Sequence, residues 1–385
     1  MIPFIDLQAQ RARIAERIDA AVLEVVAGGR YILGPQVTEF ERKLAAYAGA
    51  KHCVSCANGT DALVLPLYAW GVGEGDAVFC PSFTFVATAE IVPWTGATPV
   101  FVDIDRETYN LDPEKLDAAI TQVKAEGRLT PKVVIAVDLF GQPADYPNIA
   151  EVARKHGLKL IADSAQGFGC TLGGKHPQHW ADVTTTSFFP AKPLGAYGDG
   201  GAVLTDDDAL QDAMVSLRVH GQASARDMEE RRFTHEAKYL NVRIGMNSRL
   251  DTMQAAILLE KLAIFDEEIE ARNRVAARYN ELLAPHVTAV PKVIDGGVSI
   301  WAQYTIEHRD RDGLAAHLKG AGVPTAVYYP IPIHQQPAYD GYPQGAGGLP
   351  VTEDVSQRVI SLPMHAYLDE ATQDRIVDAV RGYNR

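Results

Sequence analysis

The chain has 385 residues, of which 47% are apolar and 22% are charged, and its formal net charge at pH 7 is −13. This composition is typical of a globular protein with about two domains and a sizeable core. Because phosphate groups are neutralised by a basic surface, the acidic balance argues against a nucleic-acid or anionic-membrane partner. An anionic ligand would therefore have to meet individually placed cations.

The N-terminal stretch is predicted to form an amphipathic helix. Ile14, Ile18, Val22 and Val25 recur at helical spacing, and a Gly-Gly pair ends the pattern. This pattern is neither that of a secretory signal nor that of a membrane span, so we expect a cytoplasmic protein.

Short apolar runs alternate with amphipathic stretches between residues 50 and 205. Strands are predicted at 52–56, 77–81, 98–104, 132–140, 158–164, 183–189 and 201–205. Helices are predicted at 59–71, 85–96, 112–127 and 146–157. The alternation predicts an α/β fold with a mainly parallel sheet covered by helices, whose ligands bind at the carboxyl ends of the strands.

The pattern changes after residue 248. Residues 249–283 have helical spacing and form either one long helix or a kinked pair. A strand at 300–309, helices at 312–322 and 369–382, and an aromatic, proline-rich loop at 329–350 follow. These elements predict a smaller α+β domain, and the loop is expected to be ordered and functional.

The cysteines and glycines exclude two common kinds of site. Cys53 and Cys56 form a Cys-x-x-Cys with no second pair of ligands, so we expect buried thiols and no metal site. Gly167 and Gly169 follow a predicted strand, but Gly173 comes one residue too late for the dinucleotide-binding fingerprint. We therefore do not expect a Rossmann-type oxidoreductase.

A lone lysine, Lys192, stands between two prolines in the apolar run SFFPAKPLG. Because an unpaired ammonium loses several kcal/mol of hydration on burial, its presence needs an explanation. Asp163 and Gln166 follow a predicted strand, Ser187 ends another, and the NGTD sequence at 58–61 opens a helix. Singly, these are ordinary turn, cap and surface residues. Their joint placement at strand ends indicates a ligand site.

Pyridoxal phosphate (PLP) would use all of these groups. Its aldehyde binds a lysine amine, which suits Lys192 if burial lowers the pKa of that amine. Its ring nitrogen is kept protonated by an ionised aspartate, here Asp163. Its phosphate needs backbone N–H groups at a helix N-terminus together with hydroxyl groups. The residues expected to supply these are Gly59, Thr60 and Ser187. Phe85 would cover the ring.

The sequence resembles the DegT/DnrJ/EryC1/StrS family of fold-type I, PLP-dependent sugar aminotransferases over nearly its whole length. The matching motifs include PFIDL, GRYILGPQVTEFE, SCANGTDAL, PSFTFVAT, TPVFVDID, TYNLDP, GQPAD, ADSAQGFG, TSFFPAKPLGAYGDGGA, GMNSRLDTMQAAIL, PTAVYYPIP and SLPMH. The resemblance implies a large PLP-binding domain at 1–248 with a seven-stranded sheet, and a small domain at 249–385. It also implies that Lys192 binds the cofactor and carries the proton, and that Gln166 lies near the ring's phenolic oxygen.

The same resemblance implies a homodimer with shared active sites. Asn247 would help to hold the phosphate and Arg249 would bind the sugar nucleotide, both from the neighbouring subunit. Tyr328 and Tyr329, where relatives often have His-Tyr, would contact the sugar. The charged segment 222–242 is either a solvated loop or a cover for the nucleotide.

The implied reaction moves an amino group from glutamate to a nucleotide-linked ketosugar for surface polysaccharide synthesis, such as that of O-antigen or lipopolysaccharide. The sequence motifs are most similar to those of the branch that aminates carbon 3 of UDP-2-acetamido-2-deoxy-3-oxo-glucuronate. Carbon-4 aminases of the perosamine or bacillosamine type, and carbon-3 aminases of dTDP-6-deoxyhexoses, are the alternatives. Two alternatives from other functional classes are a PLP lyase or desulfurase, and a non-catalytic member of the family.

Overall fold

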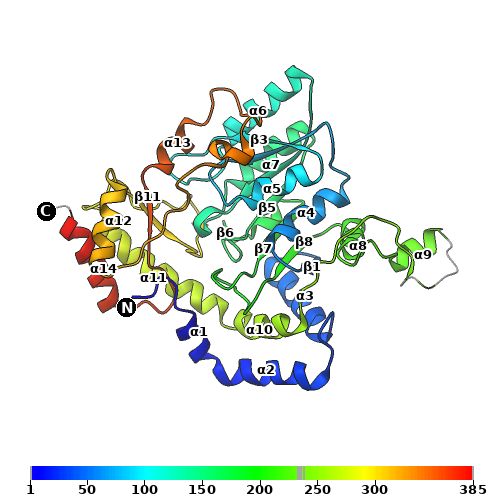
Figure 1. Cartoon of the computed structure of the whole chain (residues 1–385), viewed down its shortest axis with the longest axis horizontal. Coiled ribbons are helices and arrows are strands. Elements are labelled where there is room, and N and C mark those ends of the chain that lie inside the picture. The colour runs from blue at the N-terminus through cyan, green and yellow to red at the C-terminus, as the bar shows by residue number, and fades with distance from the viewer. Residues whose placement is uncertain (1, 232–235, 237–238, 384–385) are drawn as a thin grey trace.

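The computed structural model, which describes residues 2–231, 236 and 239–383, is built around one large sheet (Figure 1). Within these residues the sheet has seven strands, in the order β1-β8-β7-β5-β4-β2-β3. Their bounds are β1 His52–Cys56, β2 Asp76–Pro81, β3 Thr98–Val102, β4 Thr130–Val137, β5 Lys159–Asp163, β7 Val183–Ser187 and β8 Gly201–Thr205. Strand β8 runs antiparallel to both of its neighbours, β1 and β7, and the other neighbouring strands pair in parallel. The predicted mainly parallel, seven-stranded sheet is confirmed.

Strands β2 and β4 contain continuous apolar runs because helices cover both faces of the sheet. In β2, Ala77 and Phe79 pack on one face, whereas Val78 and Cys80 pack on the other. All four side chains are fully buried. Alternate residues of a strand point to opposite faces, so a continuous apolar run is what a doubly covered strand requires.

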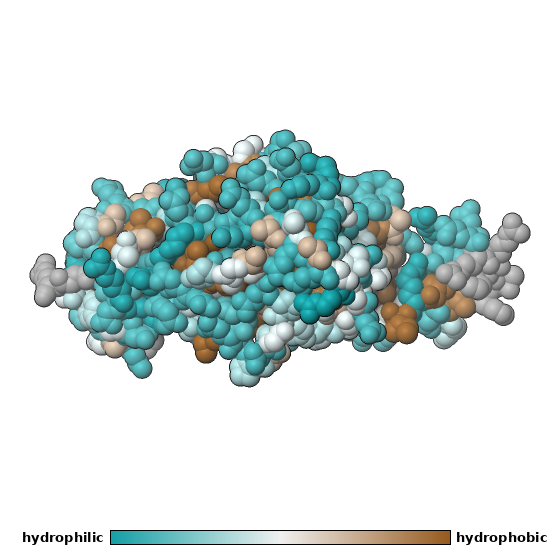
Figure 2. Space-filling model, turned by 90° about the horizontal axis from the view of Figure 1, so that it is seen from above, coloured by the Kyte–Doolittle hydropathy of each residue, from teal (hydrophilic) through white to brown (hydrophobic). Residues whose placement is uncertain are grey.

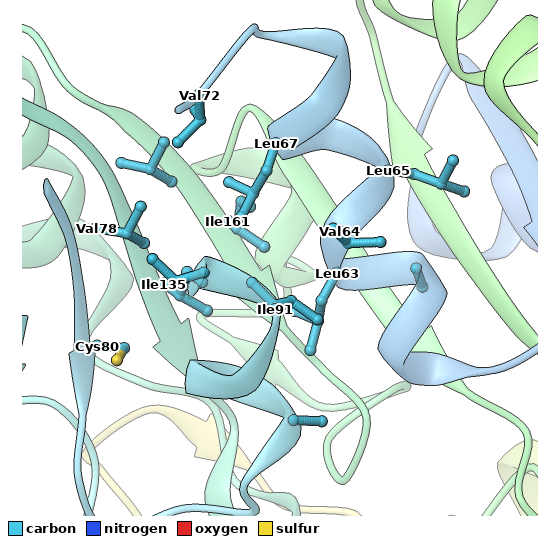
Figure 3. Packing of buried hydrophobic residues seen from close by; sticks show 14 of the residues in the cluster. Leu63, Val64, Leu65, Leu67, Val72, Val78, Cys80, Ile91, Ile135 and Ile161 are labelled. Carbon is cyan, nitrogen blue, oxygen red and sulfur yellow. The ribbon is translucent and has the colours of Figure 1, made fainter. Parts of the chain in front are cut away.

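Helices α4 (Gly59–Ala69), α5 (Ala87–Trp94) and α8 (Asp208–Leu217) cover one face. Figure 3 shows Leu63 and Ile91 from α4 and α5 close to Ile135 and Ile161 of the sheet. The other face is covered by α6 (Pro113–Glu126) and α7 (Tyr146–His156), and beside β8 by α3 (Pro35–Ala48) and α10 (Thr252–Leu262).

The predicted N-terminal helix is present but divided. It consists of α1 (Leu7–Arg13) and α2 (Ala15–Gly28), which are separated at Ile14. Ile14 and Ile18 are buried together with Ile257 of α10. The apolar stripe of the predicted helix therefore packs on α10, along the lower edge of the molecule in Figure 1.

The C-terminal part surrounds a two-stranded sheet of β10 (Tyr304–Glu307) and β11 (Val359–Leu362). Helices α11 (Phe265–Leu283), α12 (Arg311–Gly320) and α14 (Glu370–Tyr383) pack around it. Residues 249–283 are therefore a kinked pair, α10 and α11. The remaining elements are α9 Ala225–Arg231, α13 Pro350–Ser356, the strand pair β6 Thr171–Leu172 and β9 Gly297–Val298, and short 3₁₀ turns at 139–141, 177–179, 333–335 and 337–339.

The predicted domain division at residue 248 stays a prediction. Directly after it, α10 packs against α2 and α3, and its Leu258 joins the core beside β8. In contrast, Val275 and Tyr279 of α11 belong to the C-terminal core. Phe265 and Ile269, at the start of α11, still belong to the core beside β8, so we propose that the boundary lies within α11.

The charged segment 222–242 is described in part. In the segment 222–242, α9 projects from one end of the molecule (Figure 1), whereas residues 232–235 and 237–238 lie outside the described residues. The proposed role of this segment as a cover for the nucleotide thus stays a prediction.

Within the described ranges, no helix has both the length and the apolar character that crossing a membrane requires.

Candidate active site

A cleft of about 430 Å³ opens at the carboxyl ends of the parallel strands, as predicted. Its lining includes Gly59, Thr60, Phe85, Asp163, Gln166, Ser187, Lys192, Tyr328 and Tyr329. These are all of the predicted site residues except Asn247 and Arg249. The structure thus brings together residues from the ends of four strands, β1, β2, β5 and β7, and from the loop after α12, while their individual roles remain predictions.

Asp163 is the last residue of β5 and is almost fully buried. The Thr88 hydroxyl donates a hydrogen bond to its Oδ2 at 2.8 Å, and the Ala165 N–H donates to its Oδ1 at 3.2 Å. Burial raises the pKa of this carboxyl group, while these hydrogen bonds and the charge of Lys192 act in the opposite direction. A protonated ring nitrogen in the cleft would give the carboxylate the cationic partner that favours its ionised form.

Lys192 enters the cleft from the loop after β7. Its backbone N–H donates to the Phe189 carbonyl at 2.8 Å, which fixes the loop. Its amine makes no hydrogen bond or ion pair with any described residue. Burial lowers its pKa, although the nearby Asp163 charge raises it. A lowered pKa favours the neutral amine, which is the form that attacks an aldehyde.

The turn between β1 and α4 forms a cradle for an anion. Asn58 caps α4, its side chain accepting a hydrogen bond from the Asp61 N–H at 2.8 Å, so that Gly59 and Thr60 begin the helix. A Cβ atom on Gly59 would lie 2.6 Å from the Cβ of Ser187. Glycine is thus required for the helix N-terminus and the Ser187 hydroxyl to approach each other closely. A helix N-terminus and a hydroxyl group both donate hydrogen bonds to a phosphate.

Two aromatic residues and a glutamine form another wall of the cleft. The Gln166 Oε1 accepts a hydrogen bond from the Phe140 N–H at 2.9 Å, and its Nε2 donates to the Tyr329 hydroxyl at 3.0 Å. Phe85 lies 6.5 Å from the Tyr329 ring and is 53% exposed. The exposed ring of Phe85 is available to cover a planar ligand.

Asn247 and Arg249 do not line the cleft of their own chain. Asn247 is exposed, and Arg249 makes no hydrogen bond or ion pair within the described part of the chain. This placement is compatible with the prediction that both residues serve a second subunit.

Four polar residues at the cleft were not predicted: Thr84, Thr88, Asp199 and Gln303. Thr84 and Thr88 are one helical turn apart in PSFTFVAT, and their hydroxyl groups are 3.1 Å apart. The spacing of these two threonines in the sequence could have indicated that their hydroxyl groups lie together. The sequence predicts a strand at 300–309 that would include Gln303, but the strand begins only at Tyr304. No local pattern indicated its position.

These features fit PLP: an unpartnered amine, a buried carboxylate and a helix N-terminus with a nearby hydroxyl group share one cleft. Among the described residues there is no group of three or more His, Cys, Asp or Glu side chains that could hold a metal ion.

Comparisons with known proteins agree with this arrangement. The family model of the DegT/DnrJ/EryC1/StrS aminotransferases matches residues 12–381. The chain is 50% identical, over 97% of both chains, to the UDP-2-acetamido-2-deoxy-3-oxo-D-glucuronate aminotransferase of Pseudomonas aeruginosa. A solved aminotransferase of the same family from Brucella abortus has a TM-score of 0.95 and 52% identity, with complete coverage of both chains. NtdA from Bacillus subtilis, solved with the cofactor PMP, has a TM-score of 0.84 and 31% identity, with 99% of this chain and 85% of that chain covered.

Proposed function

This chain belongs to the DegT/DnrJ/EryC1/StrS aminotransferase family, and we propose that it transfers an amino group from glutamate to carbon 3 of UDP-2-acetamido-2-deoxy-3-oxo-glucuronate. It is a PLP-dependent aminotransferase. The observation that carries amino transfer is the partner-free Lys192 amine in the same cleft as the buried Asp163 carboxylate. The choice of ketosugar is supported by the Pseudomonas aeruginosa relative.

The side chains of the cleft have distinct tasks in this reaction. Bound PLP supplies an aldehyde and a ring that accepts electrons from a carbon atom losing its proton. Lys192 takes that proton and returns it, which suits an amine whose pKa burial has lowered. Asp163 would hold a proton on the ring nitrogen, and the cradle at Gly59 and Ser187 would hold the phosphate. Phe85 would cover the ring and limit its access to water.

A PLP lyase or desulfurase that works through a reactive cysteine is disfavoured. Such an enzyme needs a thiolate beside the cofactor, but all four cysteines are buried and none of them lines the cleft. Burial also raises the pKa of all four thiols, that of Cys80 to about 12, which disfavours the thiolate near neutral pH.

The ketosugar is tested by absorbance changes of the cofactor. Glutamate is expected to convert the enzyme to its amine form, and only a ketosugar that accepts the amino group returns it to the aldehyde form. We expect the 3-oxo-glucuronate derivative to do so fastest among UDP-, GDP- and dTDP-linked ketosugars. Rapid return with a 4-keto-6-deoxy sugar, and none with the 3-oxo uronate, would instead support a carbon-4 aminase.

The homodimer is part of the proposal. Ile244, three residues before Asn247, is 98% exposed. Ile32 is half-exposed and bridges to Asp251, two residues after Arg249. Figure 2 shows apolar residues at the end of the molecule that carries α9. Apolar surface close to unpartnered polar residues is typical of a subunit interface that also completes a site.

Mixing two inactive variants tests whether the sites are shared. Lys192→Ala and Arg249→Ala chains should each be impaired, whereas a 1:1 mixture should recover about a quarter of the wild-type activity. Half of the dimers would be mixed, and each mixed dimer would contain one intact site. Mixed dimers that form, as native mass spectrometry would show, but that recover no activity would contradict a shared site.

The pathway is proposed on the same basis. A nucleotide-linked amino sugar is a donor for polysaccharide assembly, so we infer a cytoplasmic step that precedes synthesis of O-antigen or another surface polysaccharide.

A further inference from the structure

Gln303 is carried into the cleft by a segment that is bound to the turn after β4. The Ile300 N–H donates to the Gly141 carbonyl at 2.9 Å, and the Gln303 N–H donates to the Phe140 carbonyl at 3.3 Å. Gly141 has φ +105°, and a Cβ atom there would lie 2.7 Å from a backbone nitrogen of this segment. The GQPAD sequence that starts at Gly141 therefore positions Gln303.

The side-chain oxygen of Gln303 has no partner. Its Oε1 is fully shielded from solvent, yet it accepts no hydrogen bond from any described residue. Gln166, the other glutamine of the cleft, has both ends of its amide bonded within the chain. A buried acceptor without a donor is unfavourable, and at a ligand cleft it indicates that the ligand supplies the donor.

We propose that Gln303 binds the ketosugar, its Oε1 accepting a hydrogen bond from a hydroxyl or acetamido N–H group of the sugar. This inference rests on the proposed function. Ionised carboxylates only accept hydrogen bonds, and the one donor group of glutamate is the nitrogen that is transferred. A sugar carries several donors that take no part in the reaction. Gln303 is therefore assigned to the second substrate and not to the amino donor.

The test is Gln303→Met, which keeps the length of the side chain and removes its hydrogen-bonding groups. For the ketosugar half-reaction, KM should rise by about three- to tenfold, with little change in kcat. The glutamate half-reaction and the dissociation constant of PLP should stay unchanged. The unfolding temperature should not fall, because no hydrogen bond within the described chain is lost.

The matched control is Gln178→Met. Gln178 is a second buried glutamine whose Oε1 has no partner within the described residues, but it lies outside the cleft. It should leave both half-reactions unchanged.

The ketosugar used is whichever one the wild-type enzyme accepts. An unchanged KM in Gln303→Met, an equal loss in both half-reactions, or weaker PLP binding would overturn the assignment of Gln303. A wild-type enzyme that reacts with glutamate but with no ketosugar would instead contradict the proposed function, and this assignment with it.

Discussion

Replacing Lys192 with alanine is expected to lower the rate of amino transfer by at least about 10⁴-fold. The amine is the only lysine group that lines the cleft, so no described lysine can replace it in carrying the proton. The variant should still fold, since the amine makes no hydrogen bond or ion pair within the described residues and its burial is unfavourable. Single-turnover absorbance measurements with glutamate give the rate, and thermal unfolding gives the stability.

A second buried lysine provides the comparison for this result. Lys261 also has a pKa lowered by burial, to about 8, but its Nζ donates to the Gly195 carbonyl at 2.6 Å and it does not line the cleft. If low pKa and burial alone made a lysine reactive, Lys261 would compete with Lys192. More than a few per cent of wild-type activity in Lys192→Ala would show that another amine does the work.

Replacing Asp163 with asparagine is expected to lower the rate by roughly 10²- to 10⁴-fold. The amide has almost the same shape and can still accept the hydrogen bond from Thr88, but it carries no charge to hold a proton on the ring nitrogen. The loss should therefore appear in kcat for both substrates. The cofactor spectrum should change as well, since the ring nitrogen would lose its proton.

Asp138→Asn is the matched control for a buried carboxyl group. Asp138 is fully buried and accepts hydrogen bonds from the Tyr146 hydroxyl at 2.7 Å and from the Ala144 N–H at 3.1 Å. Burial raises its pKa to about 7, and it does not line the cleft. Its substitution should lower the rate by less than about tenfold. Equal losses in the two variants would show that Asp163 acts through folding and not through charge.

The sheet and most of the site were predictable because their signals are local. Each apolar run between turn residues became a strand, and the polar residues directly after the strands, such as Asp163 and Ser187, necessarily gathered at one edge. The family resemblance added which of these residues would serve the cofactor, and the family is confirmed.

The features of the fold and of the site that were not predicted depend on contacts between distant parts of the chain. Gln303 faces the cleft because the GQPAD turn binds the segment before β10. The sequence of either segment alone does not indicate this contact. The break at Ile14 and the packing of α10 on α2 are likewise set by tertiary contacts. Helical periodicity predicts which residues share a face, but it does not predict which partner that face will meet.

Borohydride reduction followed by peptide mapping tests the central claim, that Lys192 in this cleft binds PLP for amino transfer. The purified protein should absorb visible light, lose that absorbance on reduction, and carry one cofactor per chain on the peptide containing Lys192. A protein that binds no cofactor, or a modification on Lys261 or any other lysine, would contradict the claim.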